Sequence, residues 1–360
     1  MGIGKIVLEL PPGENNPRNS EGAFVNLKDG RVLFMYNHYT GTSYADEAKA
    51  CLMVRYSEDM GETWSEEELF LSPDEFNAKN LMSPSFVRLS NGDLGLFFSI
   101  RYGWHDNRVR FFRSKDEGGT WSEPAKPIPA LGYFVTNNDR VVRLSNGRLI
   151  VPAAYHRLKG DDVMARGSFD SRGLAMFFYS DDDGESWTEA QNYGVLECAY
   201  SKSGLQEPGV VELENGVLWS FCRTDIGRQY ELFSIDGGTS WTTPMPSRFM
   251  SPCSPISVKR LPGNEGLFAV WNPVPANSTV ENTNPGWGRT PLVCAVSRDD
   301  GKTWGKYKVL EDDEKRGFCY VAIHFIKDNV LLAYCAGGID DGICLSRERV
   351  RKIPMQELLV

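Results

Sequence analysis

Short runs of alternating apolar and polar residues recur along the whole chain, and many are joined by an Asn-Gly or Asp-Gly pair. Such pairs occur in LKDGRVLFMY, LSNGDLGLFF, LSNGRLIVPA and LENGVLWSFC, with looser versions in LPGNEGLFAV and IKDNVLLAYC. Alternation with a period of two is typical of a β-strand with one buried face, and these dipeptides favour the tight turn of a β-hairpin. The pattern predicts six hairpins and almost no helix.

A second turn is interleaved with the hairpins and is written five times as Ser-x-Asp-x-Gly-x-Thr/Ser-Trp. The Asp side chain can accept hydrogen bonds from its own turn, the Gly supplies a backbone conformation that other residues resist, and the Trp packs an apolar ring below. These roles are structural. The serines of the five turns are Ser57, Ser114, Ser180, Ser234 and Ser297.

Counting both turns, each unit reads as four antiparallel strands. Four strands per unit at this repeat length indicate the blades of a propeller. We therefore predict an all-β fold, a six-bladed β-propeller that forms a single domain over residues 1–360. The sixth unit lacks the Ser-x-Asp turn, so we expect a strand near one terminus to close it, with KIVLEL pairing beside GICLSRERV.

Composition narrows the classes of partner. The net charge of −9 argues against nucleic acid or an anionic membrane, because both require a basic surface. No run reaches the 18 apolar residues of a membrane span. The N-terminus does not resemble a secretory signal, so a cytoplasmic location is expected, with earlier removal of a signal left open. The sequence leaves the oligomeric state open.

Cysteine and histidine offer no sign of a metal or cofactor. The eight cysteines are scattered without a C-x-x-C pair, and buried free thiols are expected for most of them. The four histidines lack the spacing of metal ligands, and we expect neither a metal ion nor a cofactor.

A binding site is expected on the face opposite the uniform turns, where the loops vary in length. Trp104, Trp271 and Trp287 lie in or near these loops, where an indole could stack on a sugar or simply pack. Counting back nine residues from each hairpin turn reaches one level of the innermost strands. A polar ring at that level is either a site or a hydrated channel lining, and its members are Glu21, Ser83, Asn138, Glu207 and Tyr320.

The Ser-x-Asp turn is the Asp-box, and its combination with six blades resembles the sialidase (neuraminidase) superfamily over essentially the whole chain. LQEPGVVELENGVLWSFCR resembles the family segment in which a glutamate opens one strand and an arginine closes the next, here Glu207 and Arg223. GWGRTPLVCAVSRDDGKTW resembles the segment of a second arginine, Arg289. GFCYVAIHFIKDNVLLAY resembles the segment that carries the nucleophilic tyrosine, Tyr320.

Asp46, in YADEAKACLMVRYSEDMGETW, lies where this family keeps its acid/base residue, with Glu47 as the near alternative. The resemblance implies that Tyr320 attacks the sugar after Glu207 takes its proton, and that Asp46 protonates the leaving oxygen. A neutral phenol avoids the repulsion that a carboxylate nucleophile would meet from an acidic sugar. Guanidinium groups would bind the carboxylate of that sugar.

The chain departs from the family in its first blade. Sialidases have an Arg-Ile-Pro motif ten residues before the turn glycine, but here that position is Ser20, beside Glu21. Glu21 would repel a substrate carboxylate unless it is neutralised. Arg18 and Arg140 could supply the missing cation, although neither matches a motif. The segment TNNDR adds Asn138 and Asp139 to the candidate substrate-binding residues.

The sequence thus predicts a sialidase-like exo-glycosidase that hydrolyses a terminal, acidic sugar of a glycan or glycoconjugate with retention of configuration. Two alternatives stay open. One is a glycosidase or lyase for a non-sialic glycan, with Glu21, Glu207 or His156 in new roles. The other is a propeller that binds glycans without catalysis, because Asp-boxes identify a fold more than a chemistry.

Overall fold

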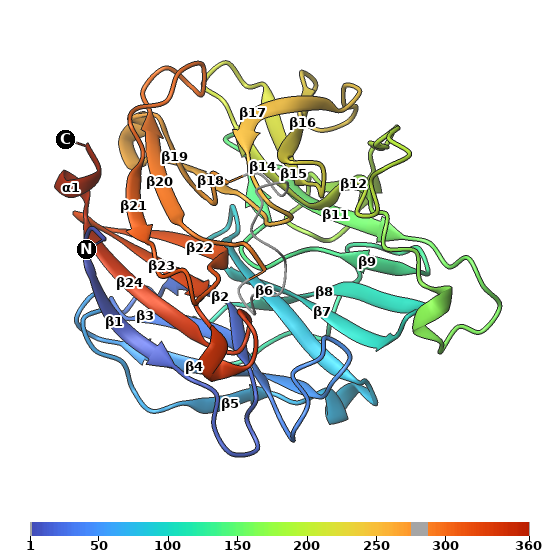
Figure 1. Ribbon diagram of the computed structural model, residues 1–360, viewed down its shortest axis with the longest axis horizontal. Helices are drawn as coiled ribbons and strands as arrows, with labels where there is room; N and C mark the ends of the chain where they lie inside the picture. The colour runs from blue at the N-terminus through green and yellow to red at the C-terminus, as the bar shows by residue number, and fades with distance from the viewer. Residues whose placement is uncertain (1, 275–286, 360) are drawn as a thin grey trace.

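The computed structural model describes residues 2–274 and 287–359, and β-strands make up almost all of their regular structure. Figure 1 shows the sheets arranged around a central axis, with the chain passing from one to the next in sequence order. The described helices are α1 (Met355–Leu359) and four short 3-10 turns, η1 (Pro73–Phe76), η2 (Arg166–Ser168), η3 (Pro262–Asn264) and η4 (Ile339–Asp341). None of the helices in the described residues is long and apolar enough to cross a membrane.

Six antiparallel blades follow one another along the chain. The first three contain β2 (Asn19–Asn26), β3 (Val32–Tyr39), β4 (Ala50–Ser57) and β5 (Glu68–Leu71); β6 (Asn80–Arg88), β7 (Leu94–Gly103) and β8 (Asp106–Ser114); and β9 (Tyr133–Val135), β10 (Val142–Arg143), β11 (Leu149–His156), β12 (Leu174–Ser180) and β13 (Thr188–Glu189). The last three contain β14 (Gln206–Glu212), β15 (Leu218–Arg223), β16 (Arg228–Ser234) and β17 (Met245–Met250); β18 (Ser257–Arg260), β19 (Leu267–Trp271), β20 (Leu292–Ser297) and β21 (Lys308–Glu311); and β22 (Cys319–Ile326), β23 (Asn329–Cys335), β24 (Glu348–Pro354) and β1 (Lys5–Leu10).

The second and third blades are joined into one eight-stranded sheet. A single parallel pair between Asn107 of β8 and Tyr133 of β9 makes the connection. The innermost strand of the third blade is interrupted, because β9 and β10 both pair with β11 and the segment between them leaves the ladder. In this respect the sheet arrangement is less regular than the repeat predicts.

The first strand of the chain closes the ring. β1 pairs antiparallel with β24 and is the outermost strand of the sheet that contains β22 and β23. The prediction that KIVLEL closes the sixth blade is confirmed, although its partner runs over Glu348–Pro354 and overlaps only the end of GICLSRERV. Two parts of the chain more than 300 residues apart therefore complete one blade.

The Asp-box turns have the structural role that the sequence predicts. In the first turn, Ser57 Oγ donates to Asp59 Oδ1 at 2.8 Å and accepts from the Gly61 N–H at 2.7 Å. Asp59 also accepts from the N–H and the hydroxyl of Thr63. The same contacts recur in the other four turns, and the Trp rings pack against the sheets, as Trp241 does on Phe177 at 3.8 Å between ring centroids.

Each inner strand of four blades carries a β-bulge, at which two residues face one on the neighbouring strand. The first residue of each bulge has a positive φ, between 51° and 59°, which is strained for a residue other than glycine. Because a bulge changes the direction of its side chain, these four residues are brought to one level near the axis. They are Glu21, Ser83, Glu207 and Tyr320.

In the third blade, the residue with positive φ lies one position closer to the hairpin turn than in the four blades that carry a bulge. There the positive φ, 57°, belongs to Asp139 rather than to Asn138, so the count of nine residues from the turn selects the wrong residue in this blade. The interruption between β9 and β10 moves the irregular position one residue closer to the turn. The fifth blade has no such bulge in the pairing of β18 with β19.

Candidate active site

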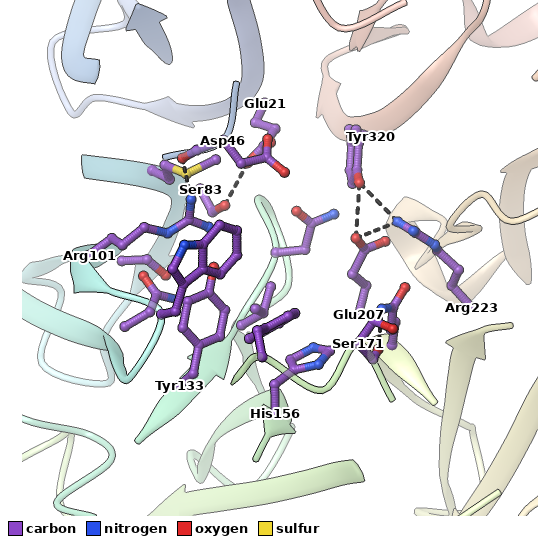
Figure 2. A pocket seen from close by; sticks show the side chains of 18 of the residues that line it. Glu21, Asp46, Ser83, Arg101, Tyr133, His156, Ser171, Glu207, Arg223 and Tyr320 are labelled. Carbon is purple, nitrogen blue, oxygen red and sulfur yellow. Dashed lines mark hydrogen bonds and ion pairs between the residues drawn. The ribbon is translucent and has the colours of Figure 1, made fainter. Parts of the chain in front are cut away.

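A cavity of about 500 Å³ lies at the level of the bulges. Four of the five ring residues predicted from the sequence line it, and Asn138 does not. The whole lining comes from the first four blades and, through Tyr320, from the sixth. It mixes three carboxylates, three guanidinium groups and several aromatic rings, which is the composition expected for a polar ligand with a ring. Figure 2 shows that Tyr320 and Arg223 lie on one side of the cavity and Arg101 and Tyr133 on the other.

Tyr320, Glu207 and Arg223 form a compact triad (Figure 2). The Tyr320 hydroxyl donates to Glu207 Oε1 at 2.9 Å, and Arg223 Nη1 donates to the same carboxylate oxygen at 2.6 Å and to the phenol oxygen at 3.0 Å. Glu207 comes from the bulge of β14 and Arg223 from the end of β15, both in the fourth blade, and Tyr320 comes from the bulge of β22 in the sixth blade. The sequence prediction that these three residues meet is confirmed by their geometry.

Electrostatics in the triad favour a protonated tyrosine in the free protein. Burial raises the pKa of Tyr320 well above its ordinary value, the charge of Glu207 raises it further, and Arg223 and Arg289 act in the opposite direction. The second carboxylate oxygen of Glu207 is buried without a partner among the described residues. Glu207 can therefore take the phenol proton at one oxygen and contact a ligand at the other.

Asp46 reaches the cavity on the loop between β3 and β4. Its backbone oxygen accepts from Asn80 Nδ2 at 2.5 Å and from Arg101 Nη1, which fixes the loop against the second blade. Its carboxylate accepts from Arg18 Nη1 at 2.6 Å, and its side chain is 56% exposed. Desolvation raises the pKa of Asp46, but Arg18 and Arg101 lower it by more, so the pKa lies below its ordinary value.

Glu21 forms an ion pair with Arg18, which it shares with Asp46. Arg18 Nη2 donates to Glu21 Oε1 at 3.0 Å, while Ser83 and Asn37 donate to Glu21 Oε2. Burial raises the pKa of Glu21, and Arg18 opposes that rise. Arg18 itself is 1% exposed, stacks on Tyr39, and does not line the cavity. The predicted replacement cation is therefore present, but it binds protein carboxylates and does not face a ligand.

Arg289 lies beneath the site and does not line the cavity. Its Nε and Nη2 donate to the backbone oxygen of Cys253, and its Nη1 donates to Cys319 Sγ at 3.0 Å. The guanidinium lies 5.4 Å from the ring centroid of Tyr320 and 5.0 Å from that of Trp287. In this arrangement Arg289 supports the tyrosine, and three of its five N–H donors are used by Cys253 and Cys319.

The residues of the TNNDR segment cross-link the blades. Asn138 Nδ2 donates to the backbone oxygens of Gly22 and Tyr320, and Asp139 forms an ion pair with Lys259 at 2.6 Å. Arg140 Nη2 donates to the Ile256 oxygen. These contacts place Asn138, Asp139 and Arg140 in the scaffold around the axis, and the structure does not bring them into the cavity lining with the other predicted residues.

Sequence reasoning missed most of the opposite wall. Arg101, Asn107, Tyr133, Asn137, Arg166 and Gln206 all line the cavity there or beside Glu207. The available signal was an arginine at the end of the apolar run LFFSIR. Ser99 pairs with the residue just before the Ser83 bulge, and Arg223 pairs with the residue just before the Glu207 bulge, so Ser99 and Arg223 hold equivalent positions in their blades. Arg101 lies two residues beyond Ser99 on the same strand. Residues two apart on a strand share a face, so both arginines point to the same region.

His156 also lines the cavity, and its environment keeps it neutral. Its Nδ1 contacts the Asp170 backbone oxygen at 3.1 Å, so this nitrogen carries the proton and Nε2 is the acceptor. Burial lowers the pKa of His156 to about 4, against the opposing effect of that contact. Among the residues that the structure describes, no group of three or more His, Cys, Asp or Glu side chains is arranged to hold a metal ion.

The bladed fold and the tyrosine–glutamate–arginine triad define a β-propeller of the sialidase type. The chain belongs to the family of the BNR repeat-like domain, whose model matches residues 63–331.

Known sialidases are similar to this chain at low identity. The chain is 30% identical over 179 residues to the anhydrosialidase of Macrobdella decora, an alignment that covers 45% of this chain and 20% of that protein. It is 21% identical over 351 residues to the sialidase of Clostridium perfringens, covering 87% and 84%. The solved structure of Hadza microbial sialidase Hz136 matches with a TM-score of 0.73 at 17% identity, covering 96% of this chain and 67% of that one. The chain spans only a fifth of the length of the Macrobdella decora protein.

Proposed function

We propose that the protein is a retaining exo-glycosidase that removes a terminal sugar from a glycan, with Tyr320 as nucleophile. The observation that supports this most directly is the triad, in which one carboxylate oxygen lies 2.9 Å from the phenol and one guanidinium nitrogen contacts both. A carboxylate at that distance can accept the proton as the phenol attacks. The similarity to sialidases supports the same reaction class.

The reaction has two steps. Tyr320 Oη attacks the anomeric carbon and transfers its proton to Glu207, while Asp46 gives a proton to the departing glycosidic oxygen. Arg223 stabilises the negative charge that develops on the phenol oxygen. In the second step Asp46 takes a proton from water, the water attacks the anomeric carbon, and Tyr320 leaves and regains its proton from Glu207. Figure 2 shows Asp46 and Tyr320 on different sides of the cavity, as attack and protonation at opposite positions require.

Hydrolysis of a panel of fluorogenic glycosides, sialosides included, tests the proposal. We expect Tyr320→Phe to lower kcat/KM by about a thousandfold or more, and Glu207→Gln by about 10²–10⁴-fold, because each loses a group that acts in the transition state. Tyr200→Phe is the matched control, since Tyr200 is 92% exposed and lies outside the cavity. Full activity of Tyr320→Phe would refute the tyrosine mechanism. Glycan binding with no turnover on any substrate would instead support a non-catalytic propeller.

A further inference from the structure

Two arginines occupy the wall of the cavity across from Tyr320. Arg101 extends from the end of β7, and its guanidinium lies 5.3 Å from the ring centroid of Tyr133 and 5.8 Å from that of Trp104. Arg166, in η2, also lies 5.8 Å from the Trp104 centroid. All four side chains line the cavity, and Figure 2 shows Arg101 and Tyr133 across from the triad. This wall therefore combines two cations with aromatic surface.

Neither of these arginines has a carboxylate partner. Within residues 2–274 and 287–359, no Asp or Glu oxygen lies within the 4.0 Å of an ion pair from Arg101 or Arg166, whereas Arg18 and Arg223 are both paired. Arg101 donates to the backbone oxygen of Asp46, while the Asp46 carboxylate is paired with Arg18 and acts on Arg101 only through space. Arg101 is nonetheless just 7% exposed, and its Nε is buried without a partner. A buried guanidinium that no carboxylate contacts directly keeps unused hydrogen-bonding capacity, so Arg101 can bind an anionic group of a ligand.

The opposite side of the cavity cannot bind an anion as readily. Arg223 is compensated by Glu207 at 2.6 Å, and Arg289 lies outside the cavity lining with three of its five N–H donors on Cys253 and Cys319. Glu21 lines the cavity between the two walls and adds negative charge near the position of the reacting sugar. An anionic group next to Tyr320 would meet the Glu207–Arg223 ion pair and Glu21, whereas one at the far wall would meet two arginines that contact no carboxylate of the described chain, with Asp46 held by Arg18 nearby.

Further polar groups around the cavity suit a hydroxylated ring. Asn107 Oδ1, Asn137 Nδ2 and Gln206 Oε1 are buried without partners in the described part of the chain, and all three side chains line the cavity. Sugar hydroxyls can both donate and accept, so they match such a mixture of donors and acceptors. Trp104 and Tyr133 present the flat surfaces on which a sugar ring can stack.

We propose that this cavity recognises a sugar whose anionic group, a carboxylate or a sulfate ester, is carried on a carbon other than the anomeric one and is bound by Arg101 and Arg166. A uronic acid or a sulfated hexose has this form. A guanidinium fork matches either group in two-pronged fashion. The inference rests on the proposed function, because it assigns the substrate class of the same cavity.

Binding of free sugars tests the inference without requiring catalysis, so its failure is distinguishable from failure of the tyrosine mechanism. Isothermal titration would compare glucuronate and galacturonate with their methyl esters, and glucose 6-sulfate and galactose 6-sulfate with the unsulfated sugars. N-acetylneuraminate, with its carboxylate on the anomeric carbon, completes the panel. The proteins are wild type, Arg101→Met, Arg166→Leu and the control Arg31→Gln, whose arginine pairs with Asp29 on the turn face.

We expect at least one anionic sugar to bind about tenfold or more tightly than its neutral counterpart, the range of a charge-assisted hydrogen bond. Arg101→Met should abolish this preference, Arg166→Leu should reduce it several-fold, and Arg31→Gln should keep it. The chemical source of the anion is given by whichever arm, uronate or sulfate, shows the preference. Because the Arg166 side chain is exposed, Arg166→Leu should fold normally, and its binding data test the inference even if Arg101→Met folds poorly.

Two results would overturn the inference. One is equal binding of every anionic sugar and its neutral counterpart. The other is a preference that survives in both Arg101→Met and Arg166→Leu, including binding of N-acetylneuraminate alone with no dependence on either arginine.

Discussion

At the residue scale, the site is defined by how its charges are paired. Arg18 binds Glu21 and Asp46 together, Arg223 binds Glu207, and Arg101 and Arg166 bind no carboxylate of the described chain. Where the family has its first arginine, this chain has a hydroxyl and an acid, and its one cation in the first blade, Arg18, is shared by two carboxylates. What changes is the side of the cavity on which free positive charge is found.

The Arg18–Asp46 ion pair leads to a pH prediction. Asp46 must be protonated to donate to the leaving oxygen, and its pKa is below the ordinary value because of Arg18 and Arg101, despite desolvation. Activity is therefore expected to be highest in acid and to fall as pH rises through that pKa. Arg18→Gln removes the positive charge, raises the pKa of Asp46, and should move this alkaline limb of kcat/KM to higher pH.

The pH–rate profiles of wild type and Arg18→Gln provide the measurement, and a thermal melt would verify that the variant is folded. An unchanged alkaline limb in a folded variant would mean that Asp46 does not supply the proton. Asp46→Asn should then retain most of the activity, and Glu47 becomes the residue to replace next.

At the scale of single elements, the Asp-box turns contribute stability without taking part in the reaction. Ser234 is 1% exposed, and its hydroxyl accepts from the Gly238 N–H at 2.8 Å and donates to Asp236 at 2.7 Å. Ser234→Ala leaves the buried Gly238 N–H unpaired, which costs about 1–3 kcal/mol. We expect a lower thermal midpoint with unchanged kcat/KM, and a loss of activity at temperatures where the variant is folded would contradict a purely structural role.

These turns also predict acid sensitivity. Hydrogen bonds from the hydroxyl and N–H of Thr303 lower the pKa of Asp299 to about 2. Because the folded pKa lies below the unfolded value of about 3.9, this group stabilises the protein fully above about pH 4 and loses that effect as pH falls toward about 2. Thermal midpoints measured from pH 6 to pH 2 should therefore drop steeply below pH 4.

Asp299→Asn should flatten part of that drop, because the amide does not titrate. Asp312→Asn is the matched control, since Asp312 is exposed and lies outside the turns. Identical curves for wild type and Asp299→Asn would show that the turn carboxylate does not contribute to the acid sensitivity.

The bulges explain both the success and the limits of the sequence prediction. Hairpin turns and Asp-boxes are local signals, so the strands could be predicted, and the family resemblance selected Tyr320, Glu207 and Asp46. The count from the turn worked where each inner strand has one bulge at the same place, and it missed Asp139 because the third blade is interrupted there. Apart from the arginine that ends LFFSIR, no local signal marks the wall of Arg101 and Tyr133, which forms only when neighbouring blades pack.

At the scale of the whole molecule, β1 is the strand that completes the ring. It pairs along β24, and Glu9 forms ion pairs with Arg347 and Arg349 at 3.2 and 2.6 Å. Deleting residues 1–10 removes these contacts from the sheet that carries Tyr320. We expect the thermal midpoint to fall by roughly 5 °C or more, since each kcal/mol corresponds to about 2–4 °C in a domain of this order of size.

Differential scanning calorimetry would measure this effect, with Ile6→Ser as the control because the Ile6 side chain is 42% exposed and the strand itself is kept. If the truncated protein has the same thermal midpoint as wild type, the stability of the ring does not depend on β1. Equal losses in both variants would assign the effect to one side chain rather than to strand pairing.

Joining the two ends of the described chain in one sheet has a consequence for biosynthesis. β1 is translated before β24, so it lacks its pairing partner until β24 has emerged from the ribosome. Tyr320 lies on that same blade, whereas Glu207 and Arg223 are translated about a hundred residues earlier. Tyr320 and Glu207 can therefore meet only after the sixth blade has been synthesised, and nascent chains that stop before residue 320 cannot form the triad.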